Sequence, residues 1–324
     1  MQQNKMWTLM VQLSFNMWTE IFPSLEFDEE MWDWIVEEAP KQGFNHILLD
    51  VGDGIQYHSH PEVSTKNAWS HKRVRQEIQR CRKAGLTIIP KLNFSSFHCN
   101  WLGRYARMIS SDIYYQVAAD LIREVYEVFE HPAYIHIGMD EEDINMAKNR
   151  EYAICRHGEL YWHDLRYLVD CVADIGAKPV IWYDAAFVHP QEYKKRFDIN
   201  EVLLSPWYYW SFKPETFTRL EDFPWKGQFD HLKIDYIEDL PRLKNFREQG
   251  VDFCRKGQEY LPTSWPERPN NTWNLMEFMM DVPDENMLGH VVATWESTTL
   301  KNKGAYEKAF RDFAEAKAKF YPNK

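Results

Sequence analysis

The stretch AYIHIGMDEED, residues 133–143, joins a short strand-like run to four consecutive carboxylates. Residues 134–138 form the run, which is apolar and alternates in the way of a β-strand. Asp140, Glu141, Glu142 and Asp143 follow almost directly. Because the active sites of parallel strand-helix folds lie at the carboxyl ends of the strands, this stretch bears on both the fold and the site.

Similar apolar runs recur along the whole chain and alternate with helical patterns. The other predicted strands are 8–13, 46–51, 87–92, 179–183, 201–205, 251–254 and 290–295. The predicted helices are 28–42, 71–84, 112–130, 160–175, 190–197, 235–249, 271–280 and 305–320. Strands that alternate with helices predict a parallel sheet covered by helices. The pattern therefore predicts an α/β fold, a single (β/α)8 TIM-type barrel over residues 1–324 with no separate N-terminal domain.

The composition narrows the class of ligand. Hydrophobic residues make up 44% and charged residues 27%, which is typical of a globular protein. The net charge of −11 argues against nucleic acid or an anionic membrane surface as a partner. Aromatic residues reach 15%, with 14 Trp, and such a surplus favours a binding surface that offers flat apolar faces to sugar rings. A carbohydrate is the partner that fits best.

Other sequence signals concern location and cofactors. The N-terminus has no signal-peptide pattern, so we expect a cytoplasmic protein as the sequence stands, or a periplasmic or secreted one if a leader has been removed. No apolar stretch reaches the roughly 20 residues of a membrane span. The five cysteines are widely spaced, so we expect thiols, mostly in the core. No phosphate-binding loop is present, and no cofactor is predicted.

Carboxylates and aromatic side chains follow the predicted strands. The residues just after strand ends are Ser14, Asn16, Asp50, Asp53, Asn93, His98, Asp140, Glu141, Trp182, Asp184, Trp207, Tyr208, Tyr209, Trp210, Trp295 and Glu296. These groups converge on one mouth of a barrel, which suits glycoside hydrolysis with one carboxyl group as acid and a second negative group. We interpret Asp140 and Glu141 as catalytic and Glu142 and Asp143 as residues that begin a helix.

The motif HIGMDE (136–141) resembles the His-x-Gly-Gly-Asp-Glu signature of family 20 glycoside hydrolases, the β-N-acetylhexosaminidases. The segments 88–101, with loop residue His98, 180–185 and 291–297 are similar to that family's third, fifth and eighth strands. The resemblance implies Glu141 as general acid/base and Asp140 as the group that orients the substrate's 2-acetamido group.

The same resemblance implies roles for other residues around the mouth. It implies that Trp182, Trp207 and Trp295 line the sugar subsite, that Glu296 binds sugar hydroxyls, and that Tyr208 or Tyr209 reaches the acetamido oxygen. With them we assign His98, Asp184 and Asp53 to substrate binding.

The sequence also departs from the family pattern. Met139 stands where the motif has its second glycine, the first strand lacks an Arg, and the loop after the sixth strand lacks an Asp. The family's small domain before the barrel is missing from the sequence. Two alternatives therefore stay open. One is a glycosidase acting on a non-acetamido sugar with Glu141 and a second carboxylate, Glu296 or Asp184; the other is a non-catalytic glycan-binding barrel. The oligomeric state is open as well.

Two histidine signals remain. His58 and His60 stand two residues apart, a spacing that can ligate zinc, but we favour substrate contact or solvent exposure and predict no metal site. His136 lies within the fourth predicted strand. It either points into the barrel core with a hydrogen bond or braces Asp140, and both interpretations stay open.

We interpret Met139 as a side chain that narrows the sugar subsite and so selects a different sugar.

Overall fold

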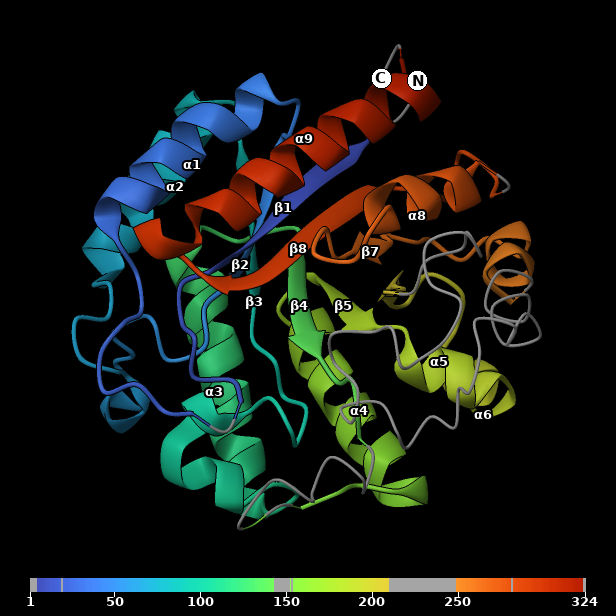
Figure 1. Cartoon of the computed structure of the whole chain (residues 1–324). Coiled ribbons are helices and arrows are strands. Elements are labelled where there is room, and N and C mark those ends of the chain that lie inside the picture. Colours follow the sequence, from blue (N-terminus) through green and yellow to red (C-terminus); the bar gives the residue numbers. More distant parts are fainter. Residues whose placement is uncertain are drawn as a thin grey trace.

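The computed structural model describes residues 5–18, 20–142, 152, 154–209, 249–280 and 282–322. An eight-stranded parallel sheet runs in the order β6-β5-β4-β3-β2-β1-β8-β7 (Figure 1). The strands are β1 Met6–Gln12, β2 His46–Asp50, β3 Thr87–Lys91, β4 Tyr134–Gly138, β5 Lys178–Trp182, β6 Leu203–Ser205, β7 Thr263–Ser264 and β8 Gly289–Ser297. The prediction of a single (β/α)8 barrel is confirmed.

Two isolated bridges close the barrel between its end strands. Leu204 pairs with Tyr260, and Trp207 pairs with Thr263, both in parallel orientation. The Thr263 N–H donates to the Pro206 carbonyl at 2.8 Å. The sheet therefore leaves no open edge for its polar backbone groups at this seam.

Helices surround the strands on the outside of the barrel (Figure 1). They are α1 Glu29–Lys41, α2 His71–Lys83, α3 Asp112–Val128, α4 Gly158–Ala173, α5 Asp184–Val188, α6 Pro190–Arg196, α8 Asn271–Met279 and α9 Lys303–Phe320. Ser70 and Ser111 cap α2 and α3, since each hydroxyl accepts a hydrogen bond from an N–H in the first helical turn. Apart from its last residue, the helix predicted over 235–249 lies outside the described residues.

The seventh strand prediction is wrong. Residues 249–255 are helical, and β7 is the two-residue segment Thr263–Ser264. Phe253 and Cys254 are buried in the layer between barrel and helices, which explains the apolar run that we took for a strand. A short run with three apolar residues in four does not distinguish a strand from a buried helix, and β7 itself carries polar side chains.

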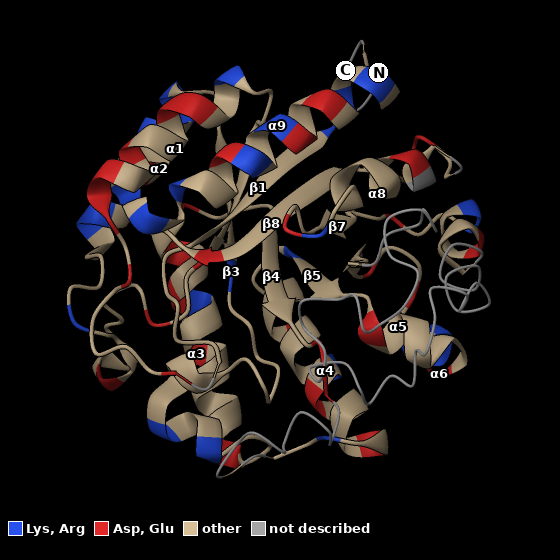
Figure 2. Cartoon of the chain, in the orientation of Figure 1, with Lys and Arg blue, Asp and Glu red and all other residues tan. Residues whose placement is uncertain are grey.

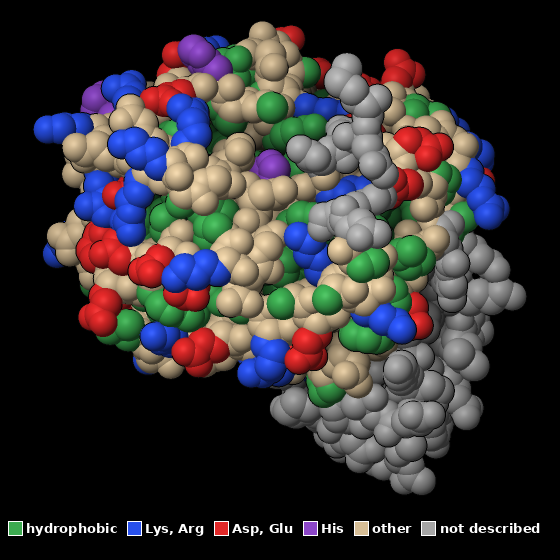
Figure 3. Space-filling model, turned by 90° about the horizontal axis from the view of Figure 1, so that it is seen from above, with side chains coloured by type: hydrophobic (Ala, Val, Ile, Leu, Met, Phe, Trp, Pro, Cys, Tyr) green, Lys and Arg blue, Asp and Glu red, His purple; other side chains and the backbone are tan. Residues whose placement is uncertain are grey.

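Two apolar clusters form the core. A smaller one fills the barrel interior and includes Met10, Leu48, Ile89, Val180 and Val291. A larger one fills the layer between strands and helices. Charged side chains lie mainly on the outer helices, while the strands are almost free of them (Figure 2). On the face seen in Figure 3 acidic and basic side chains are intermixed.

The barrel interior becomes polar toward the carboxyl ends of its strands. The last inward positions of neighbouring strands are Gln12, Asp50, Lys91, His136 and Trp182, and each of these residues is at most 3% exposed. This polar layer lies directly beneath the mouth, so the barrel core ends where polar chemistry begins.

Two smaller findings complete the fold. Among the described residues no helix is both long enough and apolar enough to span a membrane. None of the five cysteines, all within the described ranges, forms a disulfide, and Cys81, Cys99 and Cys254 are buried as expected.

Candidate active site

The turn after β4 holds two non-glycine residues in the left-handed region. Met139 has a φ of 70° and Glu141 a φ of 50°, after Gly138 at 74°. A Cβ atom on Gly138 would lie 1.9 Å from Asn93 Oδ1, so this position requires glycine. Each left-handed non-glycine residue costs roughly 1–2 kcal/mol. The turn is therefore a strained conformation that the surrounding contacts hold in place.

Asp140 lies at the base of the mouth and is buried. Asn93 Nδ2 donates to its Oδ1 at 3.0 Å, and His98 Nε2 lies 3.5 Å from its Oδ2. Burial raises the pKa of Asp140 above its ordinary value, and the Glu141 carboxylate adds to the rise, although His98 opposes it. The carboxyl group is fixed in position from two sides.

Glu141 is the more accessible of the two acids. Its Oε2 lies 2.9 Å from His98 Nε2, so one imidazole nitrogen faces both carboxylates. Burial by itself would lower the pKa of His98, but Asp140 and Glu141 raise it above its ordinary value. His98 is thus the cation that balances this pair of acids.

Asp184, the first residue of α5, completes the group of acids. Its Oδ1 accepts from the Glu141 backbone N–H at 3.3 Å, and its Oδ2 accepts from Trp207 Nε1 at 2.8 Å. Burial raises the pKa of Asp184 to about 7, and the charges of Asp140 and Glu141 contribute to this rise. Asp184 therefore holds a proton near neutral pH while it also anchors the strained turn.

Aromatic rings form a wall beside these acids. Trp182 and Trp295 lie 5.9 Å apart between ring centroids, and Trp295 Nε1 donates to the Tyr209 hydroxyl at 3.0 Å. Tyr209 in turn lies 5.0 Å from Trp207. Trp18 approaches Trp295 at 6.2 Å and extends the wall. Such faces suit the apolar C–H surfaces of a sugar ring.

A buried ion pair lies beneath the wall. Lys91 pairs with Asp50, and both side chains are almost fully buried. Lys91 Nζ lies 5.9 Å from the Trp182 ring centroid and 5.7 Å from that of Trp295. Its charge also lowers the pKa of Asp140, after the larger effects of burial and of its nearer neighbours. Lys91 is a positive charge at the floor of the mouth.

Several buried polar atoms around the mouth form no hydrogen bond within the described chain. They are both side-chain polar atoms of Gln12, Trp182 Nε1, His136 Nε2 and His98 Nδ1. Buried polar atoms in folded proteins are nearly always hydrogen-bonded, to the protein, to water or to a ligand. These groups can therefore serve a polar ligand rich in hydroxyls.

His136 points into the barrel core and, within the described residues, forms no hydrogen bond or ion pair with Asp140. Its Nδ1 accepts from the Gly138 N–H at 3.0 Å, and its ring lies 4.3 Å from Trp182. Burial lowers the pKa of His136 well below its ordinary value, so the ring is neutral. Of the two open interpretations, the structure agrees with the core position.

Three predicted site residues lie in other surroundings. Asp53 accepts hydrogen bonds from Ser14 and Asn16, at 2.8 Å from Asn16 Nδ2, and burial raises its pKa to about 6. Burial raises the pKa of Glu296. The charge of Glu267 adds to this rise, and the charge of Lys301 opposes it. Tyr208 packs against the outer cluster. Among the described residues, no hydrogen bond or ion pair joins Asp53 or Glu296 to Asp140, Glu141 or Asp184.

Glu142, which we interpreted as part of a helix start, is held by buried partners. Its carboxylate accepts from Arg156 Nε at 3.2 Å and from Ser96 N and Oγ at 2.7 and 2.8 Å. A buried arginine pairs with this acid and makes it a structural anchor; residues 143–151, where the predicted helix would begin, lie outside the described residues. Asp143 and Trp210 lie outside the described residues.

Met139 is buried in the outer cluster, 3.5 Å from Arg156. Its side chain packs in the outer cluster, whereas Trp182 and Trp295 belong to the inner one, and the interpretation that Met139 narrows the subsite stays a prediction.

The sequence also left several contributors unnamed. Lys91, Gln12, Trp18 and Arg156 all contribute to the mouth or its support, and none follows a strand in a recognisable motif. The inward register of β1 and β3 would have identified Gln12 and Lys91, because positions two apart on a strand share a face. Arg156 and Trp18 lie in loops, where no such period applies.

One group here has donor atoms at metal-binding distances. Nitrogen and oxygen atoms of His98, Asp140 and Glu141 lie within 4.8 Å of one another. The His98 nitrogen that faces the carboxylates is already engaged by them, so the ion-pair network accounts for this group without a metal.

No protein-family model matches the sequence, and no curated protein matches it. Solved structures match in fold. The chitobiase of Flavobacterium johnsoniae aligns with a TM-score of 0.65 at 14% identity, over 97% of this chain and 48% of that chain. A family 20 exo-β-N-acetylglucosaminidase from Vibrio harveyi, in complex with N-acetylglucosamine, gives 0.63 at 12% identity, over 96% and 54%. The β-N-acetylhexosaminidase of Bacteroides fragilis gives 0.61 at 14% identity, over 96% and 66%.

These matches show the barrel fold. Identities of 11% to 14% do not extend the likeness to individual site residues. This chain spans 48% to 68% of the length of the matched proteins. The resemblance that the motifs indicated is thus confirmed at the level of the fold, and the activity has to be argued from the site.

Proposed function

We propose that the protein is a glycoside hydrolase that removes a terminal β-linked N-acetylhexosamine, or a related sugar, from a carbohydrate chain. The observation that carries the proposal is the contact of Asp140 and Glu141 with a single imidazole, His98, beside a wall of tryptophans. Glycoside hydrolysis requires an acid near the leaving oxygen and a negative group near the anomeric centre. The fold of the matched N-acetylhexosaminidases supports the same substrate class.

In this proposal Glu141 is the general acid. It donates a proton to the glycosidic oxygen, and the bond from that oxygen to the anomeric carbon breaks. The acetamido oxygen of the same sugar attacks the anomeric carbon from the other face, with Asp140 orienting the amide and balancing its developing positive charge. Water then attacks the anomeric carbon, with Glu141 as base, and the product retains its configuration.

The contacts of Asp140 fit that role. Asn93 holds one of its carboxylate oxygens, and His98 lies on the other at a looser 3.5 Å. A carboxylate that is held but not tightly paired can accept a hydrogen bond from an amide N–H of the substrate. Gln12 and Trp182 offer further buried polar atoms for sugar hydroxyls.

A second candidate uses a protein carboxylate in place of the acetamido group. Asp184 accepts from the Glu141 backbone, whereas Glu296 has Glu267 and Lys301 as its charged neighbours. Among the two acids considered for this role, the contacts favour Asp184. Inhibition by a thiazoline mimic of the acetamido intermediate distinguishes the candidates, because only the first one forms such an intermediate.

The test is hydrolysis of p-nitrophenyl β-glycosides of GlcNAc, GalNAc and glucose. We expect activity on the acetamido sugars, thiazoline inhibition, and a 10²–10⁴-fold loss of kcat/KM in Glu141→Gln, the usual contribution of a general acid. Glu159→Gln, an exposed glutamate on α4, is the matched control and keeps its activity. A loss of less than about tenfold in Glu141→Gln refutes the assignment.

A further inference from the structure

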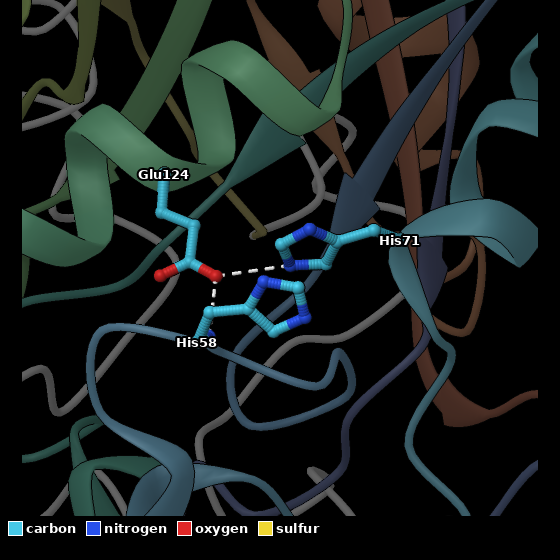
Figure 4. A group of neighbouring side chains, drawn as sticks. All are labelled: His58, His71 and Glu124. Atoms are coloured by element: carbon cyan, nitrogen blue, oxygen red, sulfur yellow. Dashed lines mark hydrogen bonds and ion pairs between the residues drawn. The ribbon is translucent and has the colours of Figure 1, made fainter.

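A second cluster of ligating side chains lies outside the barrel, apart from the acids of the mouth. His58 stands in the loop after β2, His71 is the first residue of α2, and Glu124 lies in α3 (Figure 4). Three segments that are distant in sequence thus bring two imidazoles and a carboxylate together. Their nitrogen and oxygen atoms lie within 4.8 Å of one another.

His71 and Glu124 are in close contact. His71 Nε2 lies 2.9 Å from Glu124 Oε1, so the imidazole and the carboxylate already face each other as an ion pair. A hydrogen bond and a metal bond both lie along the in-plane direction of the ring nitrogen. A metal ion held by both groups would replace their direct contact by two metal bonds, one to Nε2 and one to Oε1.

The carboxylate is oriented by the loop that carries His58. Glu124 Oε1 accepts from the His58 N–H at 2.5 Å, and Oε2 accepts from the Ser59 N–H at 2.9 Å. The Ser59 hydroxyl adds a bond to Oε2. Hydrogen bonds of this kind orient ligating carboxylates in metal sites. Glu124 is thus fixed through both oxygens, and Oε1, which accepts one hydrogen bond, keeps a second lone pair.

The third donor, His58, is exposed and stacks on His71. The ring of His58 stacks on that of His71, with centroids 3.9 Å apart and planes at 23°. His58 is exposed, so its ring can turn about its side-chain bonds. Donors around a tetrahedral zinc ion at about 2.0–2.1 Å lie roughly 3.3 Å apart, so binding requires the His58 ring to turn out of the stack and direct a nitrogen at the ion.

We propose that His58, His71 and Glu124 form a binding site for a divalent transition-metal ion, with zinc as the first choice. Two imidazoles and one carboxylate are donors that zinc accepts, with water in the fourth position. The ion would join the loop after β2 to α2 and α3, so its effect is on stability. The proposal does not depend on the hydrolase function.

The structure also revises which histidines belong together. The sequence spacing pairs His58 with His60, but His60 Nε2 lies 3.2 Å from Asp120 and its Nδ1 lies 3.6 Å from Glu62. His60 is therefore engaged by other acids, and His71 takes its place beside His58.

The experiment is titration of the full chain with zinc chloride by calorimetry, together with thermal unfolding. We expect a site with one zinc per chain, and a rise in Tm of about 4 °C when zinc is present at a hundred times its Kd. His58→Gln and His71→Gln each weaken binding at least about tenfold. His163→Gln, an exposed histidine elsewhere, leaves binding unchanged.

The His58 variant keeps the test valid, because the backbone N–H that holds Glu124 remains and the side chain is exposed. His58→Cys should restore binding and add a thiolate charge-transfer band when Co²⁺ is bound. Binding that is unchanged in His58→Gln, or that is lost only in His98→Gln, overturns the proposal, since the latter result places the metal among the acids of the mouth.

Discussion

Asp184 and Asp164 are two aspartates with little access to water, yet their surroundings have opposite charge balances. Asp184 lies with Asp140 and Glu141, and burial together with these charges raises its pKa to about 7. Burial acts to raise the pKa of Asp164 as well. Hydrogen bonds from Tyr115 and Ser110 and the charge of Arg156 outweigh burial and lower this pKa below its ordinary value.

The same contrast divides the acidic stretch after β4. Asp140 and Glu141 share one imidazole, whereas the next residue, Glu142, joins Asp164 around the buried guanidinium of Arg156. Burial alone does not identify a functional acid. What distinguishes the mouth is an excess of acids over cations, because that excess keeps protons available near neutral pH.

The strongest test of this contrast removes the cation from the compensated group. Arg156→Met leaves Glu142 and Asp164 as uncompensated buried acids, so we expect a loss of about 3–5 kcal/mol in the free energy of unfolding. Urea denaturation at pH 7 measures it.

Arg166→Met is the matched control for that variant. The ion pair of Arg166 with Glu201 is about one third exposed, so its loss should cost less than about 1 kcal/mol. If the two variants lose similar stability, the group around Arg156 is not the anchor that its burial implies.

The sequence predicted the acids of the mouth but not their balance. Asp140 and Glu141 follow a strand with a recognisable pattern, and the period of two in β3 would have placed Lys91 in the interior. Arg156 is separated from Glu142 by a stretch with no periodicity, and its pairing depends on how that loop returns. The charge balance is therefore a property of tertiary contacts, which a single sequence does not encode in any local pattern.

The fold shows the same division. Runs of apolar residues located the longer strands, because burial on both faces leaves a continuous signal. β7 has two polar residues, Thr263 and Ser264, and is held by the seam with Trp207 and by β8. Its assignment depends on the pairing that closes the barrel, which no local sequence pattern shows. The largely apolar run at 251–254 was the stronger strand signal in this part of the chain.

The raised pKa of Asp184 makes the free energy of unfolding depend on pH. The folded-state pKa of Asp184 is about 7, above its ordinary 3.8, so the folded protein binds this proton more tightly than the unfolded chain. The stability from Asp184 is therefore present below about pH 4 and is lost as pH rises through about 7. In Asp184→Asn we expect the fall in unfolding free energy over this range to be shallower, by up to about 1.4 kcal/mol per pH unit.

Asp53→Asn is the control for this slope, because the pKa of Asp53 is raised only to about 6. It should flatten the curve from about pH 4 to 6 and leave the slope between 6 and 7 unchanged. Urea titrations at half-unit pH steps measure both variants. An unchanged slope above pH 6 in Asp184→Asn contradicts the excess of acids in the mouth.

A smaller effect follows from removing the one cation that the two mouth acids share. His98→Gln keeps an amide that can donate to Glu141 but removes the positive charge that lowers the pKa of Asp140. Under the proposed function Asp140 must be ionised, so the acid limb of kcat/KM should move up by about one pH unit. The pH profile of the glycosidase assay measures it, with His131→Gln as an exposed control. If the acid limb of the pH profile does not move, the charge of His98 does not balance that of Asp140.

The smallest effect is expected at Met139, which stands between the two regions. Its backbone forms the strained turn before the acids, but its side chain packs in the outer cluster beside Arg156. Met139→Leu conserves volume, so we expect a stability change below about 1.5 kcal/mol and an unchanged preference between GlcNAc and GalNAc substrates. Trp182→Phe, which alters the wall itself, is the positive control and should raise KM. If Met139→Leu changes the sugar preference while Trp182→Phe does not, the side chain at 139 reaches the subsite. In that case the turn after β4 contributes side chains both to the sugar subsite and to the buried group around Arg156.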